Sequence, residues 1–319
     1  MSKIIITSDW HIHKYNQYSI DNSRLFIILN WIEWLFKFSN KNGIKHILFA
    51  GDMFNNFDNL SVIVLNNTIR TFKKIFGLYP DIEFYYITGN HDMAELATLN
   101  NTEHSLFVLQ ELFQKNFKSL CYPNKLILDD ITFIGFPYVK NPQEILDTLQ
   151  TINVDTKHLN LLTHQMITQL IPVANDFDIF DAVFNKVSYV FNGHVHHFET
   201  LSHKFINIGN PYHRDLGDYG DRKYIIVLET ETNEWQPYDV TNKSPIFIKK
   251  KPDEPISEDE KNNFIVIESE KVDMDTGDFN DEEFSVEVDD ISLVKNYWKT
   301  VSNDTKLLEV GINLITKKL

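Results

Sequence analysis

The 319-residue chain lacks cysteines beyond Cys121, a hydrophobic run of membrane-spanning length, and an excess of positive charge. A single cysteine excludes an internal disulfide and is typical of a reducing compartment. No apolar stretch is long enough for a transmembrane helix, and no signal-peptide pattern is present. Internal repeats and low-complexity tracts are also missing. We therefore expect a cytoplasmic protein with no membrane partner.

The charge of −15 is unevenly distributed along the chain. Residues 251–290 contain sixteen Asp and Glu against three Lys, so the remaining chain is close to neutral. Nucleic-acid binding relies on Lys and Arg contacts to phosphates. The chain alone would therefore hold a nucleic acid only modestly, and a partner could supply the missing charge. The acidic segment can also be an ordinary solvated face.

Five short apolar runs each end at residues that commonly bind metals. Their lengths and β-branched content are typical of buried strands. In open α/β sheets, ligands bind at the carboxyl ends of strands. Gly51, Gly89 and Gly193 lie at three of these ends, where a backbone needs positive φ or close approach. The runs and the residues after them are 3–8 with Asp9 and His11, 44–50 with Asp52, 84–88 with Asn90, 159–163 with His164, and 189–191 with His194 and His196.

Carboxylates and imidazoles in this order suit the hydrolysis of a phosphate ester. Two cations about 3.5–4 Å apart can activate a water and stabilise the phosphoryl oxygens. Asp52 is the natural bridge, because a carboxylate can bind two ions. The other six residues divide into two sets, Asp9, His11 and His196 for one ion and Asn90, His164 and His194 for the other. Mixed oxygen and imidazole ligation favours Mn²⁺, with Mg²⁺, Fe or Zn²⁺ as alternatives.

The same blocks resemble the calcineurin-like metallophosphoesterases. Within that superfamily, the chain resembles the SbcD-type nuclease subunit of the DNA double-strand-break repair complex, of which phages encode a relative in a recombination endonuclease. The resemblance rests on residues 7–11 (Thr-Ser-Asp-Trp-His) and 51–54 (Gly-Asp-Met-Phe), and on residues 205–224, which are similar to the segment closing the nuclease domain. The protein Ser/Thr phosphatases carry Asp-Arg-Gly after the second block, which is absent here.

The resemblance implies the same seven metal ligands and adds two roles. His91 would protonate the leaving sugar oxygen, and Asp92 would orient its imidazole. His13 and His197 flank the ligand blocks without an assigned role. Residues 55–58 lack the histidine that relatives often carry near the DNA.

Alternating strands and helices predict an α/β fold, which by resemblance is a two-sheet sandwich flanked by helices. Helices are expected over 24–38, 60–76 and 104–113. In SbcD-like proteins, helices in the positions of the last two pair to form a homodimer. The alternative is that these two helices pack in the core. We divide the chain into a nuclease domain (1–240), a small acidic α/β capping domain (241–290) with strands at 245–248, 264–267 and 284–288, and C-terminal partner-binding helices (291–319). Those helices would bind the partner or pack on the capping domain.

The function this implies is a Mn²⁺-dependent DNA exo/endonuclease subunit that processes DNA ends, duplex or single-stranded, in recombination and repair. It would work with an SbcC-like coiled-coil ATPase, in the host cytoplasm if the gene is a phage gene. Two alternatives stay open, a stand-alone nucleotide phosphodiesterase and a non-catalytic scaffold subunit. In the first of these, residues 240–319 would have no function.

Overall fold

The computed structural model describes residues 2–56, 59–93, 98–99, 102–141, 143–166 and 186–267. The chain divides into two units, Met1–Glu268 and Ser269–Leu319. The second unit lies outside the described residues, and so do the strand expected at 284–288 and the helices expected over 291–319. The proposed domain boundaries at 240 and 290 stay predictions.

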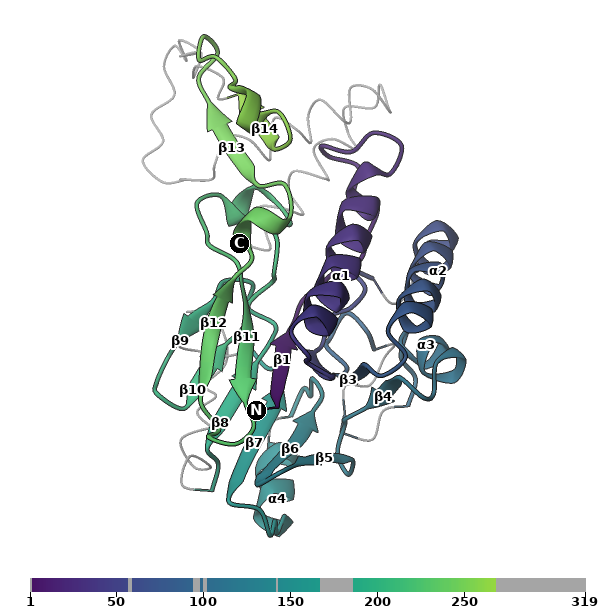
Figure 1. Cartoon of the computed structure of the whole chain (residues 1–319), viewed down its shortest axis with the longest axis vertical. Coiled ribbons are helices and arrows are strands. Elements are labelled where there is room, and N and C mark those ends of the chain that lie inside the picture. Colours follow the sequence, from purple (N-terminus) through teal and green to yellow (C-terminus); the bar gives the residue numbers. More distant parts are fainter. Residues whose placement is uncertain are drawn as a thin grey trace, which may run out of the picture. The chain divides into compact units, whose positions relative to one another are not determined.

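Two six-stranded sheets form the centre of the first unit (Figure 1). The first sheet has the order β12-β11-β1-β2-β3-β4. The four strands β1 to β4 are parallel, whereas β11 and β12 add antiparallel strands at one edge. Its strands are β1 Lys3–Thr7, β2 His46–Ala50, β3 Glu83–Ile87, β4 Phe117–Ser119, β11 Tyr224–Glu229 and β12 Trp235–Asp239.

The second sheet has the order β5-β6-β7-β8-β10-β9. Its four inner strands are parallel, and β5 and β9 are antiparallel edge strands. The five runs expected to be strands before the ligand residues are therefore confirmed as β1, β2, β3, β7 and β8. The strands of this sheet are β5 Lys125–Leu128, β6 Ile131–Phe136, β7 His158–Thr163, β8 Tyr189–Asn192, β9 Glu199–Thr200 and β10 Phe205–Asn207.

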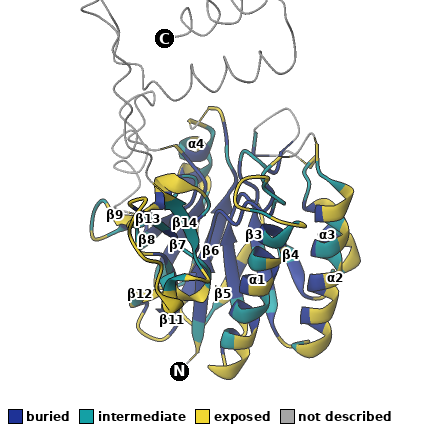
Figure 2. Cartoon of the chain, turned by 90° about the horizontal axis from the view of Figure 1, so that it is seen from above, coloured by how far each residue is buried: buried dark blue, intermediate teal, exposed yellow. Residues whose placement is uncertain are grey.

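Alternate residues of the strands pack into different core layers. In β1, Ile5 joins the layer that contains helices α1 (Ser23–Lys41) and α2 (Val62–Leu78). Ile4 and Ile6 point the other way, into the layer between the two sheets. A third layer lies between the second sheet and α4 (Gln143–Thr151). Figure 2 shows buried strands inside and exposed outer faces on the helices. The α/β sandwich flanked by helices is thus confirmed.

Helix positions follow the apolar pattern, with one difference. α1 covers its expected range and α2 begins and ends two residues later than expected, whereas the third helix is shorter than predicted and spans only α3, Phe107–Leu112. His104 instead forms an isolated bridge with Met93, and the next residue, Ser105, donates its backbone N–H to the carbonyl of Asp92 in the loop after β3. Among the helices of the described ranges, none combines the length and apolarity needed to cross a lipid bilayer.

A separate two-stranded parallel sheet follows β12, made of β13 (Phe247–Lys250) and β14 (Phe264–Ile267). These are the first two strands expected after residue 240. Phe247 anchors the sheet: its ring packs against Tyr18 at 5.2 Å between centroids, and its N–H donates to His213 Nδ1 at 3.2 Å. The guanidinium of Arg24 lies 5.0 Å from the ring centre of Phe264.

Candidate metal centre

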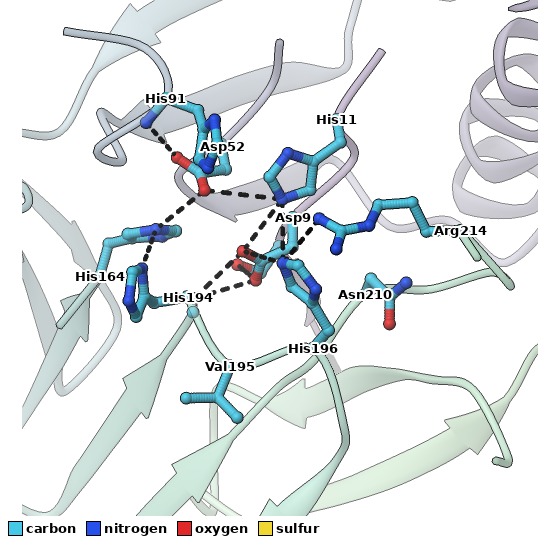
Figure 3. A network of polar contacts seen from close by, with 12 residues as sticks. Asp9, His11, Asp52, His91, His164, His194, Val195, His196, Asn210 and Arg214 are labelled. Atoms are coloured by element: carbon cyan, nitrogen blue, oxygen red, sulfur yellow. Dashed lines mark hydrogen bonds and ion pairs between the residues drawn. The ribbon is translucent and has the colours of Figure 1, made fainter. Parts of the chain in front are cut away.

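All seven predicted ligands lie within four residues of a strand end, on three strands of the first sheet and two of the second. Because these strands are parallel within each sheet, their carboxyl ends meet at one edge. Figure 3 shows the side chains from both sheets converging there. Sequence spacing could not show this convergence, since the two sheets come together only through the core between them.

One group of candidate ligands consists of Asp9, His11 and His196, whose ligand atoms lie within 4.8 Å of one another. The Nε2 of His11 lies 3.1 Å from the Nε2 of His196 and 3.9 Å from Asp9 Oδ1. Asp9 is held on two sides. The Ser8 hydroxyl donates to its Oδ2 at 2.5 Å, and the backbone N–H of His194 lies 3.1 Å from both carboxylate oxygens.

A second group consists of Asp52, His164 and His194. His164 Nδ1 donates to the Ala50 carbonyl at 2.6 Å, which directs its Nε2 toward the centre. That nitrogen lies 3.3 Å from Asp52 Oδ2. The amide oxygen of Asn90 joins this group, 3.2 Å from His164 Nε2 and 2.9 Å from His194 Nδ1.

Asp52 belongs to the second group, and together with His11 and His91 it forms a further cluster of possible ligands, so it lies between the two groups. Its Oδ2 lies 3.3 Å from His164 Nε2 and 3.6 Å from His11 Nε2, and its other oxygen accepts the backbone N–H of His91 at 2.9 Å. One carboxylate oxygen between two sets of nitrogens is the arrangement that a bridging ligand needs. The two groups contain the residues that the sequence analysis assigned to separate ions, and the assignment of ligands to ions stays a prediction.

The backbone around these ligands is tightly constrained. Asp9, His11, Asp52 and His194 all have positive φ, at 54°, 41°, 60° and 85°. Residues other than glycine rarely adopt this region, and such strain clusters at functional sites. Gly51 also has positive φ, at 89°.

Residues 2–198 match the family described as calcineurin-like phosphoesterase. The chain belongs to the calcineurin-like phosphoesterase family. No curated protein matches the sequence. Among solved structures, an archaeal phosphodiesterase described as novel is similar at 15% identity, over 74% of this chain and 99% of that one, with a TM-score of 0.37. A Thermus thermophilus protein, TT1561, is similar at 10% identity, over 75% and 98%, with a TM-score of 0.43. The family match carries the assignment.

Membership makes the chain a metal-dependent phosphoesterase, and the donor set fits divalent cations. Nε2 of His164 faces the Asp52 carboxylate, and Nε2 of His11 faces Nε2 of His196. Each of these pairs needs either a proton or a cation between its two atoms, and a bound metal ion can take the place of the proton. Carboxylate, amide and imidazole donors without a thiolate suit a cation of intermediate hardness. Which metal binds is part of the proposal below.

Burial and charge shift the pKa values of these groups in opposite directions. Burial raises the pKa of Asp9 to about 7. Burial acts on Asp52 in the same direction, but the neighbouring His164 and His11 outweigh it and lower its pKa. Burial disfavours the His164 imidazolium, yet the carboxylates of Asp52 and Asp9 raise its pKa to about 9. A proton on His164 therefore supplies positive charge that a cation can replace.

The other three ligand imidazoles are poor proton acceptors, and burial lowers the pKa of His11 well below its ordinary value. Burial and the nearby His164 lower the pKa of His194 to about 3. Burial and the charge of Arg214 lower the pKa of His196 to about 4. All three rings are therefore neutral near pH 7, which is the form that ligates metals.

Asp92 has a different position from the one expected. Its carboxylate does not reach the His91 imidazole in the described contacts but accepts four backbone N–H groups, from residues 52, 53, 54 and 89, at 2.8 to 3.3 Å. Asp92 therefore fixes the loop that carries Asp52. The imidazole of His91 is bound instead through Nδ1 to the carbonyl of Asn55, at 2.7 Å. The expectation was wrong because adjacent residues after a strand point to different partners.

Two histidines without an assigned role have partners elsewhere. His13 Nδ1 accepts the N–H of Tyr15 at 3.1 Å, and His197 Nε2 lies 3.2 Å from Glu199. In contrast, sequence reasoning did not single out Arg214, whose Nη1 lies 3.3 Å from His196 Nε2. It lies in the segment 205–224 that resembles the end of the nuclease domain, but no spacing rule links it to the ligands.

Proposed function

We propose that the chain is the Mn²⁺-dependent nuclease subunit of a DNA end-processing complex, and that it cleaves phosphodiester bonds at a binuclear centre. The observation that carries the proposal is the Asp52 carboxylate, whose Oδ2 lies 3.6 Å from His11 Nε2 of the first ligand group and 3.3 Å from His164 Nε2 of the second. Asp9, His11 and His196 would hold one ion, and Asn90, His164 and His194 the other, with Asp52 bridging.

The ions would supply an activated water and charge for the phosphoryl oxygens. His91 would supply the proton for the leaving oxygen. Its Nδ1 faces a carbonyl, which only accepts hydrogen bonds, so Nδ1 keeps its hydrogen and Nε2 is the atom that exchanges a proton. One ring nitrogen of His91 lies within 4.8 Å of the ligand atoms of His11 and Asp52, so the imidazole borders the proposed metal centre.

The additional β13–β14 sheet supports a macromolecular substrate. A single nucleotide would need only the edge of the two large sheets, and the small sheet is anchored through Phe247 and Phe264 beside residues 18–24. We assign this sheet to the capping domain that contacts DNA. The remaining chain is close to neutral, which is consistent with weak DNA binding by the chain alone. An SbcC-like ATPase, bound through residues 291–319, would provide the additional affinity for DNA.

The homodimer is proposed to form through α2 and α3. Both helices expose large apolar side chains: Val62 and Ile63 are 70% and 46% exposed, and Phe107 and Leu112 are 52% and 54% exposed. These exposed apolar side chains are the observation that favours an interaction surface on the two helices. Sedimentation analysis of the purified chain tests this part independently of catalysis.

The direct test compares three substrates with Mn²⁺: a linear duplex DNA, a cyclic dinucleotide, and the chromogenic diester bis(p-nitrophenyl) phosphate. Each is assayed with and without an SbcC-like ATPase. The proposal expects DNA end cleavage that the ATPase stimulates. Hydrolysis of the dinucleotide but not of DNA would instead indicate a stand-alone nucleotide phosphodiesterase.

His91→Asn separates catalysis from a scaffold role. We expect it to abolish DNA cleavage while Mn²⁺ binding and ATPase binding persist. His158→Asn is the matched control, because His158 lies at the opposite end of β7 from the site and contacts Ser188. If His91→Asn processes DNA ends as well as the wild-type complex, the chain acts as a scaffold.

A further inference from the structure

The guanidinium of Arg214 is aimed at the first ligand group (Figure 3). Its Nη1 lies 3.3 Å from His196 Nε2. On its other side, Nε and Nη2 bind the Asp215 carboxylate at 3.2 and 3.1 Å. Asp215 therefore holds two of the three nitrogens and leaves the third facing the centre. The Arg214 side chain is 23% exposed, so it lies at the rim of the site.

The loop that carries Arg214 is fixed by buried polar contacts. Asp218 Oδ2 accepts the backbone N–H of Arg214 at 2.6 Å, and the Arg214 carbonyl accepts a hydrogen bond from the Arg24 guanidinium. Asp218 is itself paired with Lys223, which is 1% exposed. Lys223 Nζ also lies 3.4 Å from the carbonyl of His196, so the same lysine ties this loop to a ligand. Arg214 is thus positioned by the fold.

The contact between Arg214 and His196 cannot persist when a metal binds. His196 Nε2 offers one lone pair, which either accepts an Arg214 N–H or ligates a cation. Arginine has only donors and keeps its charge. Once a cation takes the lone pair, Nη1 needs another acceptor at the edge of the site. The anion that a phosphoesterase brings there has such acceptors on its phosphoryl oxygens.

We infer that Arg214 binds a non-bridging oxygen of the substrate's phosphate group, on the side of the site formed by Asp9, His11 and His196. Guanidinium–phosphate hydrogen bonds are charge-assisted and directional. The bond lies next to the charge that develops on the phosphoryl group, so it assists the reaction as well as binding. This inference rests on the proposed function, since it assigns a substrate contact within the same site.

The test uses Arg214→Ala and Arg214→Lys, with Arg222→Ala as the matched control. Arg222 is 75% exposed at the side chain, and its nearest carboxylate, Asp239, lies 4.0 Å away. Three quantities are measured: kcat/KM on bis(p-nitrophenyl) phosphate, the affinity for inorganic phosphate by calorimetry on the Mn²⁺-loaded protein, and the affinity for Mn²⁺ alone.

We expect Arg214→Ala to lower kcat/KM about 100-fold, the loss typical of removing one donor to a developing oxyanion. Phosphate affinity should fall about tenfold or more. Arg214→Lys should lie between Ala and wild type, because lysine keeps the charge but not the planar fork. Mn²⁺ affinity should be unchanged or higher, since His196 loses a competing donor.

The outcomes separate this inference from the proposed function. Wild-type kcat/KM and phosphate affinity in Arg214→Ala would overturn the inference and leave the nuclease proposal standing. Weakened Mn²⁺ binding in this variant would also overturn it, because Arg214 would then act only by supporting the ligands. If the wild-type protein hydrolyses no diester, the proposed function fails, and the phosphate titration alone decides whether Arg214 binds the anion.

Discussion

Replacing Gly89 with alanine tests whether the backbone after β3 must pass directly behind the shared carboxylate. A Cβ at this position would lie 2.0 Å from Asp52 Oδ1 and 2.6 Å from the backbone nitrogen of Asp52. Ordinary contacts of a Cβ begin at 3.4 Å. The carboxylate would therefore have to move by more than 1 Å, and the backbone contact prevents a simple rotation of the side chain.

The size of the effect follows from this displacement. Asp52 Oδ2 lies 3.3 Å from His164 Nε2 and 3.6 Å from His11 Nε2. A shift of the carboxylate by more than 1 Å would therefore place it too far from at least one of the two metal ions to bridge them. A misplacement of about 1 Å at a reacting centre costs on the order of 100-fold in rate. The extra methyl group should also destabilise the fold by about 1–3 kcal/mol, as overpacking does.

The assay is Mn²⁺-dependent hydrolysis of bis(p-nitrophenyl) phosphate, with thermal unfolding and Mn²⁺ titration on the same samples. Gly77→Ala is the control, because Gly77 lies in α2 and a Cβ there meets nothing within 4 Å. It should be as active as wild type and as stable or more so, since alanine favours helix. A Gly89→Ala protein with wild-type turnover and Mn²⁺ affinity would refute the reasoning.

Three further predictions concern charge. Asp92→Asn, measured at pH 8, should lose about 1.5–3 kcal/mol of unfolding free energy, because an amide cannot accept from four backbone donors; equal stability in denaturant titrations would contradict this. Asp218→Asn should cost about 3 kcal/mol, because it removes the nearer carboxylate from buried Lys223 and leaves only that of Asp221, 3.6 Å away. Burial raises the pKa of Asp218, but Lys223 outweighs burial and holds the pKa below the ordinary 3.8. The stabilisation by this pair is therefore present above pH 3.8 and is lost as the pH falls through the lowered pKa. The variant should lack this loss of stability at low pH, and a pH profile of stability identical to that of the wild type would argue against the pair. Finally, Mn²⁺ must displace a proton from His164, whose pKa is raised to about 9. At pH values below about 9, the affinity of the protein for Mn²⁺ should therefore rise by up to about tenfold for each unit of increase in pH. Calorimetry that finds no proton release on Mn²⁺ binding would exclude this competition.

Much of the fold was predictable because local sequence determines local structure. The run before Asp9 alternates side chains between two core layers, and its β-branched residues favour a strand. The helices α1 and α2 follow from their apolar stripes, and α1 ends before Asn42 and Gly43, where φ is +69°. The third helix was less predictable, since His104 pairs with Met93 instead of extending the helix.

The sequence by itself determined which residue types follow each strand and in what order, and this sufficed to predict the candidate ligands and the α/β class. It could not determine the distances within the site, because the contact of Asp52 with His164 joins segments from two different sheets. Tertiary structure decided that Asp92 supports a loop and that Arg214 reaches His196. The physical reason is that periodicity reports which face a side chain occupies, whereas distances across a site depend on how the sheets pack.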